Sequence, residues 1–103
     1  MADENLKIIK DIVLEILPGS DVVLFGSRAR QTNRNDSDYD LLILIDEEMS
    51  PKDKMPLRTR VRMELGKLKI YADILLQSKK EASLKKELPG HIIRHALMEG
   101  HLL

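Results

Sequence analysis

The apolar run LLILI at residues 41–45 constrains the fold more than any other feature of this chain. A strand with one face in water alternates apolar and polar residues, whereas an uninterrupted run of this length is typical of a central strand covered on both faces. Two other short apolar segments, residues 21–25 and 70–76, have the composition of strands. The sequence therefore predicts a small sheet with a layer packed on each face.

The segments between these strands have helical periodicity. Apolar residues recur at helical spacing over residues 4–17, and again from Ser50-Pro51, which resembles a capped helix start, to about Lys69. Pro56 is expected to fit only in a first helical turn. Residues 79–88 predict a short helix or turn, and residues 89–100 a helix closed by Gly100. The predicted fold class is α/β (α+β), a small mixed sheet flanked by helices, in one domain spanning residues 1–103.

Composition excludes several classes of function. The 103 residues include no cysteine, which rules out disulfides, iron–sulfur clusters and thiolate zinc sites. No apolar run reaches the length of a membrane span, and the charged start is unlike a secretory signal, so we expect a cytoplasmic protein without membrane contact. The formal net charge is zero and aromatic residues are scarce, so direct nucleic-acid binding is not expected.

Two aspartates precede the central strand. Side chains at positions i and i+2 of a strand point to the same face, so Asp38 and Asp40 are expected to project side by side while Tyr39 points away. Two neighbouring carboxylates repel each other, and a divalent cation such as Mg²⁺, which prefers oxygen ligands, would remove that cost. Asp36 shares the alternation and is a second-rank candidate. The alternative for such a pair is a solvated strand end.

Two further features favour a metal and phosphate site. Asp73 is an acid inside a predicted strand, a position that aspartate disfavours, and its alternative is an edge-strand acid facing water. Gly26-Ser27 follows the first strand, where glycine allows a ligand to approach the backbone and serine can cap a short helix whose N–H groups face a phosphate. Arg28 and Arg30 could add positive charge at that turn.

These motifs together resemble the nucleotidyltransferase superfamily that includes DNA polymerase beta, and most closely its minimal nucleotidyltransferase branch. The resemblance consists of Gly26-Ser27, the ten residues 28–37, Asp38-Tyr39-Asp40 and then Asp73. It covers about residues 20–76, and the ending IIRHALMEGHLL resembles the C-terminal helix and short last strand of the family. The chain departs from the family at residue 31, where glutamine replaces a frequent glycine, and this departure concerns the shape of the loop rather than the chemistry.

The resemblance implies a role for each residue of the motif. Asp38 and Asp40 would bind magnesium and the nucleotide, and Asp73 would bind a second magnesium ion and help to deprotonate an acceptor hydroxyl. Gly26 and Ser27 would hold the terminal phosphates. With Arg30, they form the expected nucleotide-binding set. The hydroxyl would attack the α-phosphorus of a nucleoside triphosphate, with ATP as the expected substrate, and expel pyrophosphate.

The resemblance also implies a partner. Small members of this branch accompany helical HEPN proteins, often ribonuclease toxins, and some transfer AMP onto a tyrosine of that partner. We therefore expect an antitoxin that modifies a HEPN protein and forms a hetero-oligomer with it. Two alternatives are a module that neutralises its partner by contact alone and a small-molecule nucleotidyltransferase. The expectation that no second, acceptor-binding domain follows favours a protein acceptor. Candidates for the partner interface are the apolar residues Leu6, Ile9, Leu97 and Leu102.

Overall fold

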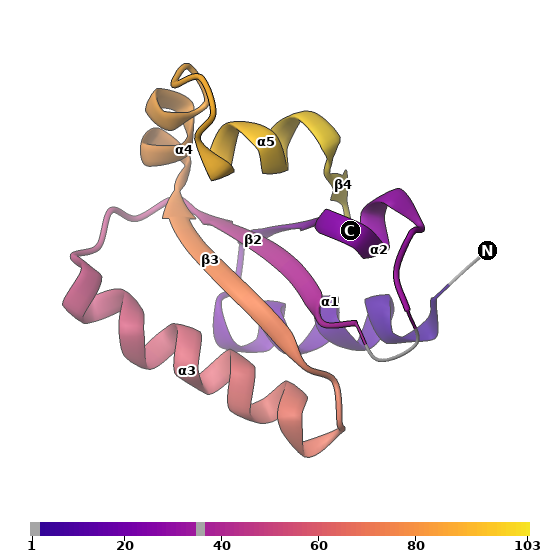
Figure 1. Ribbon diagram of the computed structural model, residues 1–103. Coiled ribbons are helices and arrows are strands. Elements are labelled where there is room, and N and C mark those ends of the chain that lie inside the picture. The colour runs from indigo at the N-terminus through magenta and orange to yellow at the C-terminus, as the bar shows by residue number, and fades with distance from the viewer. Residues whose placement is uncertain (1–2, 35–36) are drawn as a thin grey trace.

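The computed structural model describes residues 3–34 and 37–103 of the chain. Asp36, the second-rank metal candidate, lies outside the described residues. Figure 1 shows a central sheet with helices on both sides. In chain order the elements are α1 (Glu4–Ile16), β1 (Asp21–Phe25), α2 (Gly26–Arg30), β2 (Tyr39–Ile45), α3 (Pro51–Lys67), β3 (Ala72–Ser78), α4 (Lys79–Lys85), α5 (Ile92–Glu99) and β4 (His101–Leu102).

The four strands form one mixed sheet in the order β3-β2-β1-β4. β1 runs antiparallel to both of its neighbours, β2 and β4, whereas β2 and β3 are parallel. The parallel pair needs a crossover connection, which α3 provides. This arrangement confirms the predicted mixed sheet and places β2 in its interior, as the LLILI run indicates.

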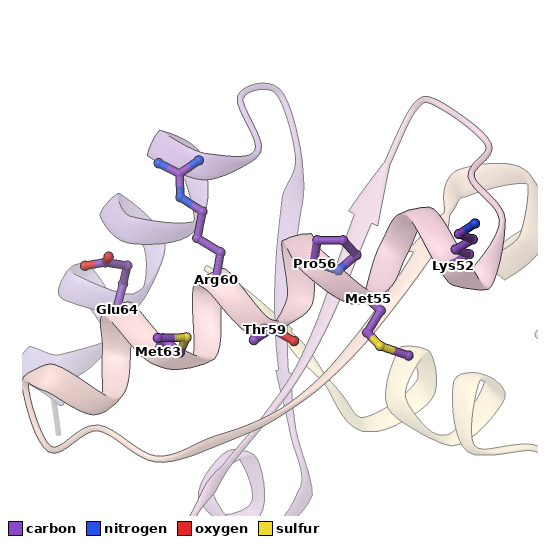
Figure 2. Close-up of a pocket in the computed structure, with 7 residues that line it drawn as sticks. All are labelled: Lys52, Met55, Pro56, Thr59, Arg60, Met63 and Glu64. Carbon is purple, nitrogen blue, oxygen red and sulfur yellow. The ribbon is translucent and has the colours of Figure 1, made fainter.

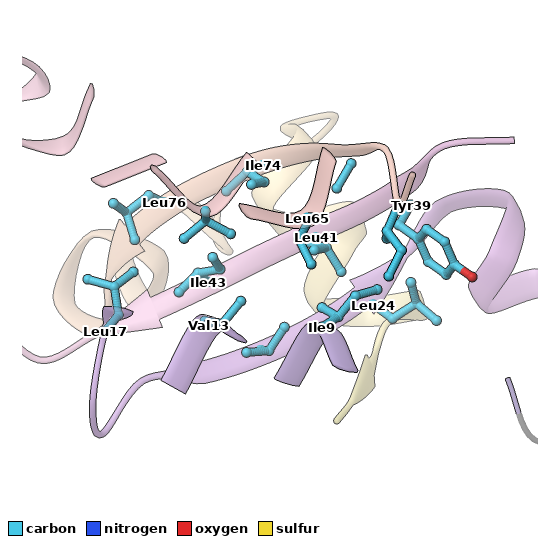
Figure 3. Close-up of a cluster of buried hydrophobic side chains, with 14 of the residues drawn as sticks. Ile9, Val13, Leu17, Leu24, Tyr39, Leu41, Ile43, Leu65, Ile74 and Leu76 are labelled. Carbon is cyan, nitrogen blue, oxygen red and sulfur yellow. The ribbon is translucent and has the colours of Figure 1, made fainter. Parts of the chain in front are cut away.

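Two hydrophobic clusters cover the two faces of the sheet. The larger cluster combines α1 and α3 with alternate strand residues, among them Leu41 and Ile43 of β2, and is drawn in Figure 3. The smaller cluster contains Leu42 and packs Ile93 and Ala96 of α5 onto the other face. Leu41, Leu42 and Ile43 are all fully buried. Because alternate residues of β2 enter opposite clusters, Asp40 points to the face that α4 and α5 cover.

Helix α3 begins where the sequence predicts and then continues through a proline. The Ser50 hydroxyl accepts a hydrogen bond from the Asp53 N–H, and Pro51 occupies the first turn. The expectation that Pro56 fits only in the first turn is wrong, because Pro56 lies inside the helix. The helix tolerates the lost hydrogen bond because its apolar side packs into the larger cluster, where Val61 and Leu65 are fully buried.

Three other expectations differ in detail. β2 begins at Tyr39, so Asp38 lies one residue before the strand, and β3 begins at Ala72 rather than at residue 70. Ile9 belongs to the core and not to a free surface, since it is fully buried in the larger cluster, whereas Leu102 is exposed. Within the described part of the chain, no helix combines the length and the apolar character that crossing a membrane requires.

Candidate functional site

Asp40 and Asp73 lie directly opposite each other on the parallel strands β2 and β3. Register partners on adjacent strands point to the same face of a sheet, so both carboxylates belong to the face covered by α4 and α5. Asp40 is half-buried and Asp73 is exposed. Two acids that are far apart in sequence therefore meet where both strands begin.

The pKa of Asp40 reflects this crowding. Burial raises the pKa of Asp40 above its ordinary value, and the charges of Asp73 and Asp38 raise it further, against a smaller lowering by Arg30. Asp38, exposed just before β2, is thus close enough to repel Asp40 electrostatically. The three acids singled out in the sequence contribute to one negative region at this end of the sheet.

The donor set of this region suits a hard cation, although the side chains are not arranged as a closed cage. Residues 3–34 and 37–103 contain no cluster of three or more His, Cys, Asp or Glu side chains already at metal-binding distances. Mg²⁺ is nevertheless bound in proteins by one or two carboxylates together with water and substrate phosphates. Burial and repulsion from Asp73 and Asp38 raise the pKa of Asp40, which means that keeping this carboxylate ionised costs free energy. A bound cation would reduce that cost.

Gly26 brings the end of β1 against the same carboxylate. Its φ is +73°, in the left-handed region, and a Cβ built on it would collide with the Asp40 carboxylate. Phe25, the residue before it, is the register partner of Asp40. Only glycine fits this conformation and this close approach without strain. The glycine turn and the acids consequently belong to one site rather than to two separate features of the chain.

The sequence suggested that Ser27 caps a short helix and that Arg28 adds positive charge at the turn, and the structure shows other positions for both. Ser27 lies within the first turn of α2 and does not cap it, because Phe25 occupies the cap position and provides no side-chain hydrogen bond. The guanidinium of Arg28 donates to the Ser37 carbonyl at 2.7 and 2.9 Å and stacks 4.0 Å above the Tyr39 ring. Arg28 therefore joins α2 to the segment that leads to the two aspartates.

Gln31 marks the end of the short helix α2. It ends α2 in the left-handed conformation, with φ +60°. Side chains other than glycine pay about 1–2 kcal/mol for this region of backbone space. The turn at residue 31 therefore carries local backbone strain.

Glu99 is a site residue that the sequence analysis missed. Its carboxylate accepts the Gly26 N–H at 2.9 Å and pairs with the Arg30 guanidinium at 3.0 and 3.1 Å. Burial alone would raise the pKa of Glu99, but the Gly26 N–H, Arg30 and His95 outweigh it and hold that pKa below its ordinary value. The available signal was a single acid on α5, placed directly before the closing Gly100.

Two hollows on the described surface lie away from the acids. One, of about 480 Å³, follows the outer side of α3, where Met55 and Met63 project from the helix in Figure 2. The other, of about 820 Å³, lies between the start of α1, α2 and the C-terminal residues. Neither is lined by Asp38, Asp40 or Asp73. Asp38 and Asp73 are exposed and Asp40 is half-buried, so the acids are open to solvent at this end of the sheet.

Comparison with known proteins identifies the class of this fold and site. The family model for the nucleotidyltransferase domain matches residues 6–100. The chain therefore belongs to the nucleotidyltransferase domain family, and it has the mixed four-stranded sheet and flanking helices of the polymerase beta-like fold. No curated protein matches the chain.

Several solved structures share the fold. One, described as a toxin–antitoxin with AMP-PNP, superposes with a TM-score of 0.61 at 19% identity, over 97% of this chain and 72% of that chain. Another contains a tri-AMPylated Shewanella oneidensis HEPN toxin in complex with an MNT antitoxin, with a TM-score of 0.57 at 16% identity, over 95% of this chain and 67% of that chain. A further Shewanella oneidensis structure gives a TM-score of 0.56 at 13% identity, over 99% of this chain and 71% of that chain. At these identities the likeness establishes the fold alone.

Proposed function

We propose that this chain is a magnesium-dependent nucleotidyltransferase of the minimal type, which transfers AMP from ATP to a hydroxyl of a HEPN protein and acts as the antitoxin of that protein. One observation carries the proposal. Asp40 lies opposite Asp73 in the β2–β3 register, and the Gly26 backbone is pressed against the Asp40 carboxylate. A glycine turn able to approach a phosphate and a group of carboxylates able to hold a cation therefore adjoin each other.

The proposed division of labour follows from position. Gly26 and Ser27 would receive the terminal phosphates at the first turn of α2, and magnesium held by Asp38, Asp40 and Asp73 would neutralise the triphosphate and acidify the acceptor hydroxyl. The hydroxyl oxygen forms a bond to the α-phosphorus while the bond to the bridging oxygen of pyrophosphate breaks. Asp73, exposed at the edge of the sheet, would take the proton that the hydroxyl loses.

Arg30 was expected to bind the nucleotide directly, but its present contact supports a different use. Its guanidinium is engaged by Glu99 through two hydrogen bonds. A paired guanidinium neutralises less of the charge on a phosphate than a free one does. We therefore assign Arg30 a supporting role at the turn and Ser27 the direct phosphate contact, while Gly26, whose N–H Glu99 accepts, lets the phosphate approach the backbone closely.

The choice of partner is supported by the proteins that share the fold. Of those structures, one is described as a toxin–antitoxin with AMP-PNP, and another contains an AMPylated HEPN toxin with an MNT antitoxin. The open position of the acids is compatible with a protein acceptor, whose hydroxyl must reach the α-phosphorus. Exposed apolar side chains such as Leu102 are available for an interface. A specific interface buries at least about 1,000 Å² in total.

The proposal is tested by incubating the chain with ATP, Mg²⁺ and a purified HEPN protein encoded next to it. Intact-protein mass spectrometry should show the partner heavier by one or more AMP units, and tandem spectra should place them on a hydroxyl-bearing side chain. Omitting magnesium, or replacing ATP with AMP, should leave the partner unmodified. The variant Asp73→Asn preserves the shape of the side chain but removes the proposed base, so it should abolish the transfer of AMP.

Other results would redirect the assignment. A partner that binds tightly and loses its activity without any mass change would establish neutralisation by contact. Rapid modification of a small hydroxylated molecule, with no protein ever labelled, would remove the antitoxin role while keeping the nucleotidyltransferase. Failure to bind any Mg-nucleoside triphosphate would contradict the enzymatic proposal itself.

A further inference from the structure

The contact between α5 and the glycine turn connects two distant parts of the chain. Glu99 is the last residue of α5, and its carboxylate oxygen Oε1 accepts the Gly26 N–H at 2.9 Å. The same carboxylate binds Arg30 at the other end of α2 through both of its oxygens, at 3.0 and 3.1 Å. A single side chain thus holds the first and last residues of α2.

The surroundings make α5 a firm support for this contact. Ile93 and Ala96 are buried in the smaller hydrophobic cluster, so the helix is anchored on the sheet independently of Glu99. Gly100, directly after Glu99, leaves no space for a side chain, since a Cβ there would collide with the Ala96 carbonyl and with Val23 of β1. The Glu99 backbone is therefore fixed beside the end of β1, and only 17% of its side-chain surface is exposed.

Placing the Glu99 carboxylate beside Gly26 also brings its negative charge near Asp40. The negative charge of Glu99 is among the charges that raise the pKa of Asp40, so it adds to the repulsion at the carboxylate end of the sheet. Gly26, in turn, has a left-handed φ of +73°, and a Cβ on this residue would collide with the Asp40 carboxylate. The hydrogen bond to Glu99 fixes the Gly26 peptide in the orientation that this approach requires.

We propose that Glu99 is a positioning residue for triphosphate binding, which acts through Gly26 by holding the Gly26–Ser27 turn and α2 in place. This inference rests on the nucleotidyltransferase function proposed above. It assigns the effect to the hydrogen-bond acceptor of Glu99 rather than to its charge. The opposite possibility, in which the carboxylate competes with phosphate for Gly26 and Arg30, predicts the reverse change in affinity and is separated by the experiment below.

The experiment compares Glu99→Ala, which removes the acceptor, with Glu99→Gln, which keeps an oxygen acceptor and removes the charge. Glu87→Ala, at an exposed acid in the turn after α4, is the matched control. The first measurement needs no ligand: amide hydrogen exchange of Gly26, followed by NMR. Glu99→Ala should lose at least about tenfold of the Gly26 protection, whereas Glu99→Gln and Glu87→Ala should retain it.

The second measurement is the affinity for MgATP by calorimetry. We expect about tenfold weaker binding in Glu99→Ala, which loses one hydrogen bond, and near wild-type binding in Glu99→Gln and Glu87→Ala. Tighter binding in both Glu99 variants would overturn the inference and establish competition with phosphate. Unchanged Gly26 exchange and unchanged affinity in Glu99→Ala would overturn it while the nucleotidyltransferase stands. A wild-type chain that binds no Mg-triphosphate would instead refute the proposed function and, with it, the phosphate role of the turn.

Discussion

The two ends of the β2–β3 strand pair differ in how their charged side chains are arranged. Where the strands begin, Asp40 faces Asp73, and burial together with the charges of Asp73 and Asp38 raises the pKa of Asp40. Where they end, the buried Lys54 and the partly exposed Glu81 form an ion pair with N–O distances of 2.8 and 2.9 Å. One end accumulates like charges and the other neutralises opposite ones. The comparison teaches that charge stabilises the end that carries no proposed chemistry and destabilises the end that carries it.

The paired end is also completed by helix capping. The Ser78 hydroxyl accepts the Glu81 N–H at 3.0 Å, and the Glu81 carboxylate accepts the Ser78 N–H at 2.8 Å, which is a capping box. Lys79, next along the chain, pairs with Asp46 just beyond β2 at 2.9 Å. Lys54 and Glu81 are thus paired with each other, and Glu81 also caps α4, so removal of this pair should reduce stability.

The largest expected effect is the loss of nucleotide binding in the double variant Asp38→Asn, Asp40→Asn. Removing both charges should weaken MgATP binding at least about hundredfold, because the carboxylates are the proposed cation ligands. Repulsion at the acidic end falls at the same time, so the melting temperature should stay equal or rise. Calorimetric titration and a thermal melt measure both.

The matched control for this variant is Asp11→Asn with Glu15→Gln, two exposed acids of α1 on the other face of the sheet. It removes the same charge without touching the site, and its MgATP affinity should equal that of the wild type. Equal affinity in the Asp38 and Asp40 double variant would show that the acidic end is not the cation site.

At the paired end, Lys54→Met should lower the free energy of unfolding by roughly 2 kcal/mol, because it leaves the partly exposed Glu81 carboxylate without the buried ammonium that it pairs with. Urea denaturation measures the loss. Lys52→Met, at an exposed position of the same helix, should change stability by less than about 0.5 kcal/mol. A Lys54 variant as stable as the Lys52 variant would mean that the two ends do not differ as described.

A smaller effect is expected from Ser27→Ala, which keeps the backbone N–H groups of the turn and removes one hydroxyl. Triphosphate binding should weaken by about 1–2 kcal/mol, the range of one hydrogen bond to a charged group. Ser27→Asp should bind more weakly still, because it places a negative charge against phosphate. The exposed Ser83→Ala of α4 is the control. Full activity in Ser27→Asp would exclude a phosphate contact at this turn.

The smallest effect is a pair of opposite pH dependences. The pKa of Asp40 is raised from 3.8, mainly by burial and then by Asp73, so its destabilising effect is present at neutral pH and is relieved as the pH falls through the raised value. Burial alone would raise the pKa of Glu81 above 4.5, but the Lys54 ammonium and the Ser78 N–H outweigh it and lower that pKa. The stabilising effect of Glu81 is therefore present above its unfolded-state value and is lost as the pH falls through the lowered one.

Urea denaturation between about pH 7 and pH 3 checks these signs, each worth a fraction of a kcal/mol because both groups are partly exposed. Relative to the wild type, Asp40→Asn should gain least at the acidic extreme, and Lys54→Met should lose least there. If both variants followed the wild-type pH profile in parallel, the electrostatic contrast between the ends would be contradicted.

The sequence predicted the elements that local chemistry determines. The apolar run of β2, the Ser50-Pro51 start of α3 and the first strand at residues 21–25 all occur as expected. The helical periodicity of α1 also places its boundaries within a residue of the prediction. These features depend on neighbours within a few positions in sequence, so periodicity and capping rules are sufficient to find them.

The sequence did not reveal what depends on the register and on distant contacts. Nothing local shows that Asp73 is opposite Asp40 rather than one residue to either side, since a slip of one residue would turn it to the other face. The role of Glu99 was missed because its partners, Gly26 and Arg30, come from the opposite end of the chain. The assignment of Asp38, Asp40 and Asp73 as magnesium ligands stays a prediction, because only binding of the metal ion defines its ligands.

The hydrogen bond between Glu99 and Gly26 also sets the order in which the molecule can be completed. It joins residues 73 positions apart, and β4, which follows at once, pairs with β1 at Val23 and Leu24. The β1–β2 hairpin and the β2–α3–β3 unit need only nearby chain and can form early, since short loops close at lower entropic cost. A segment at residues 99–102 therefore fixes a turn about seventy residues earlier in the sequence. We therefore expect the acidic strand ends to come together during folding before the glycine turn beside them is secured.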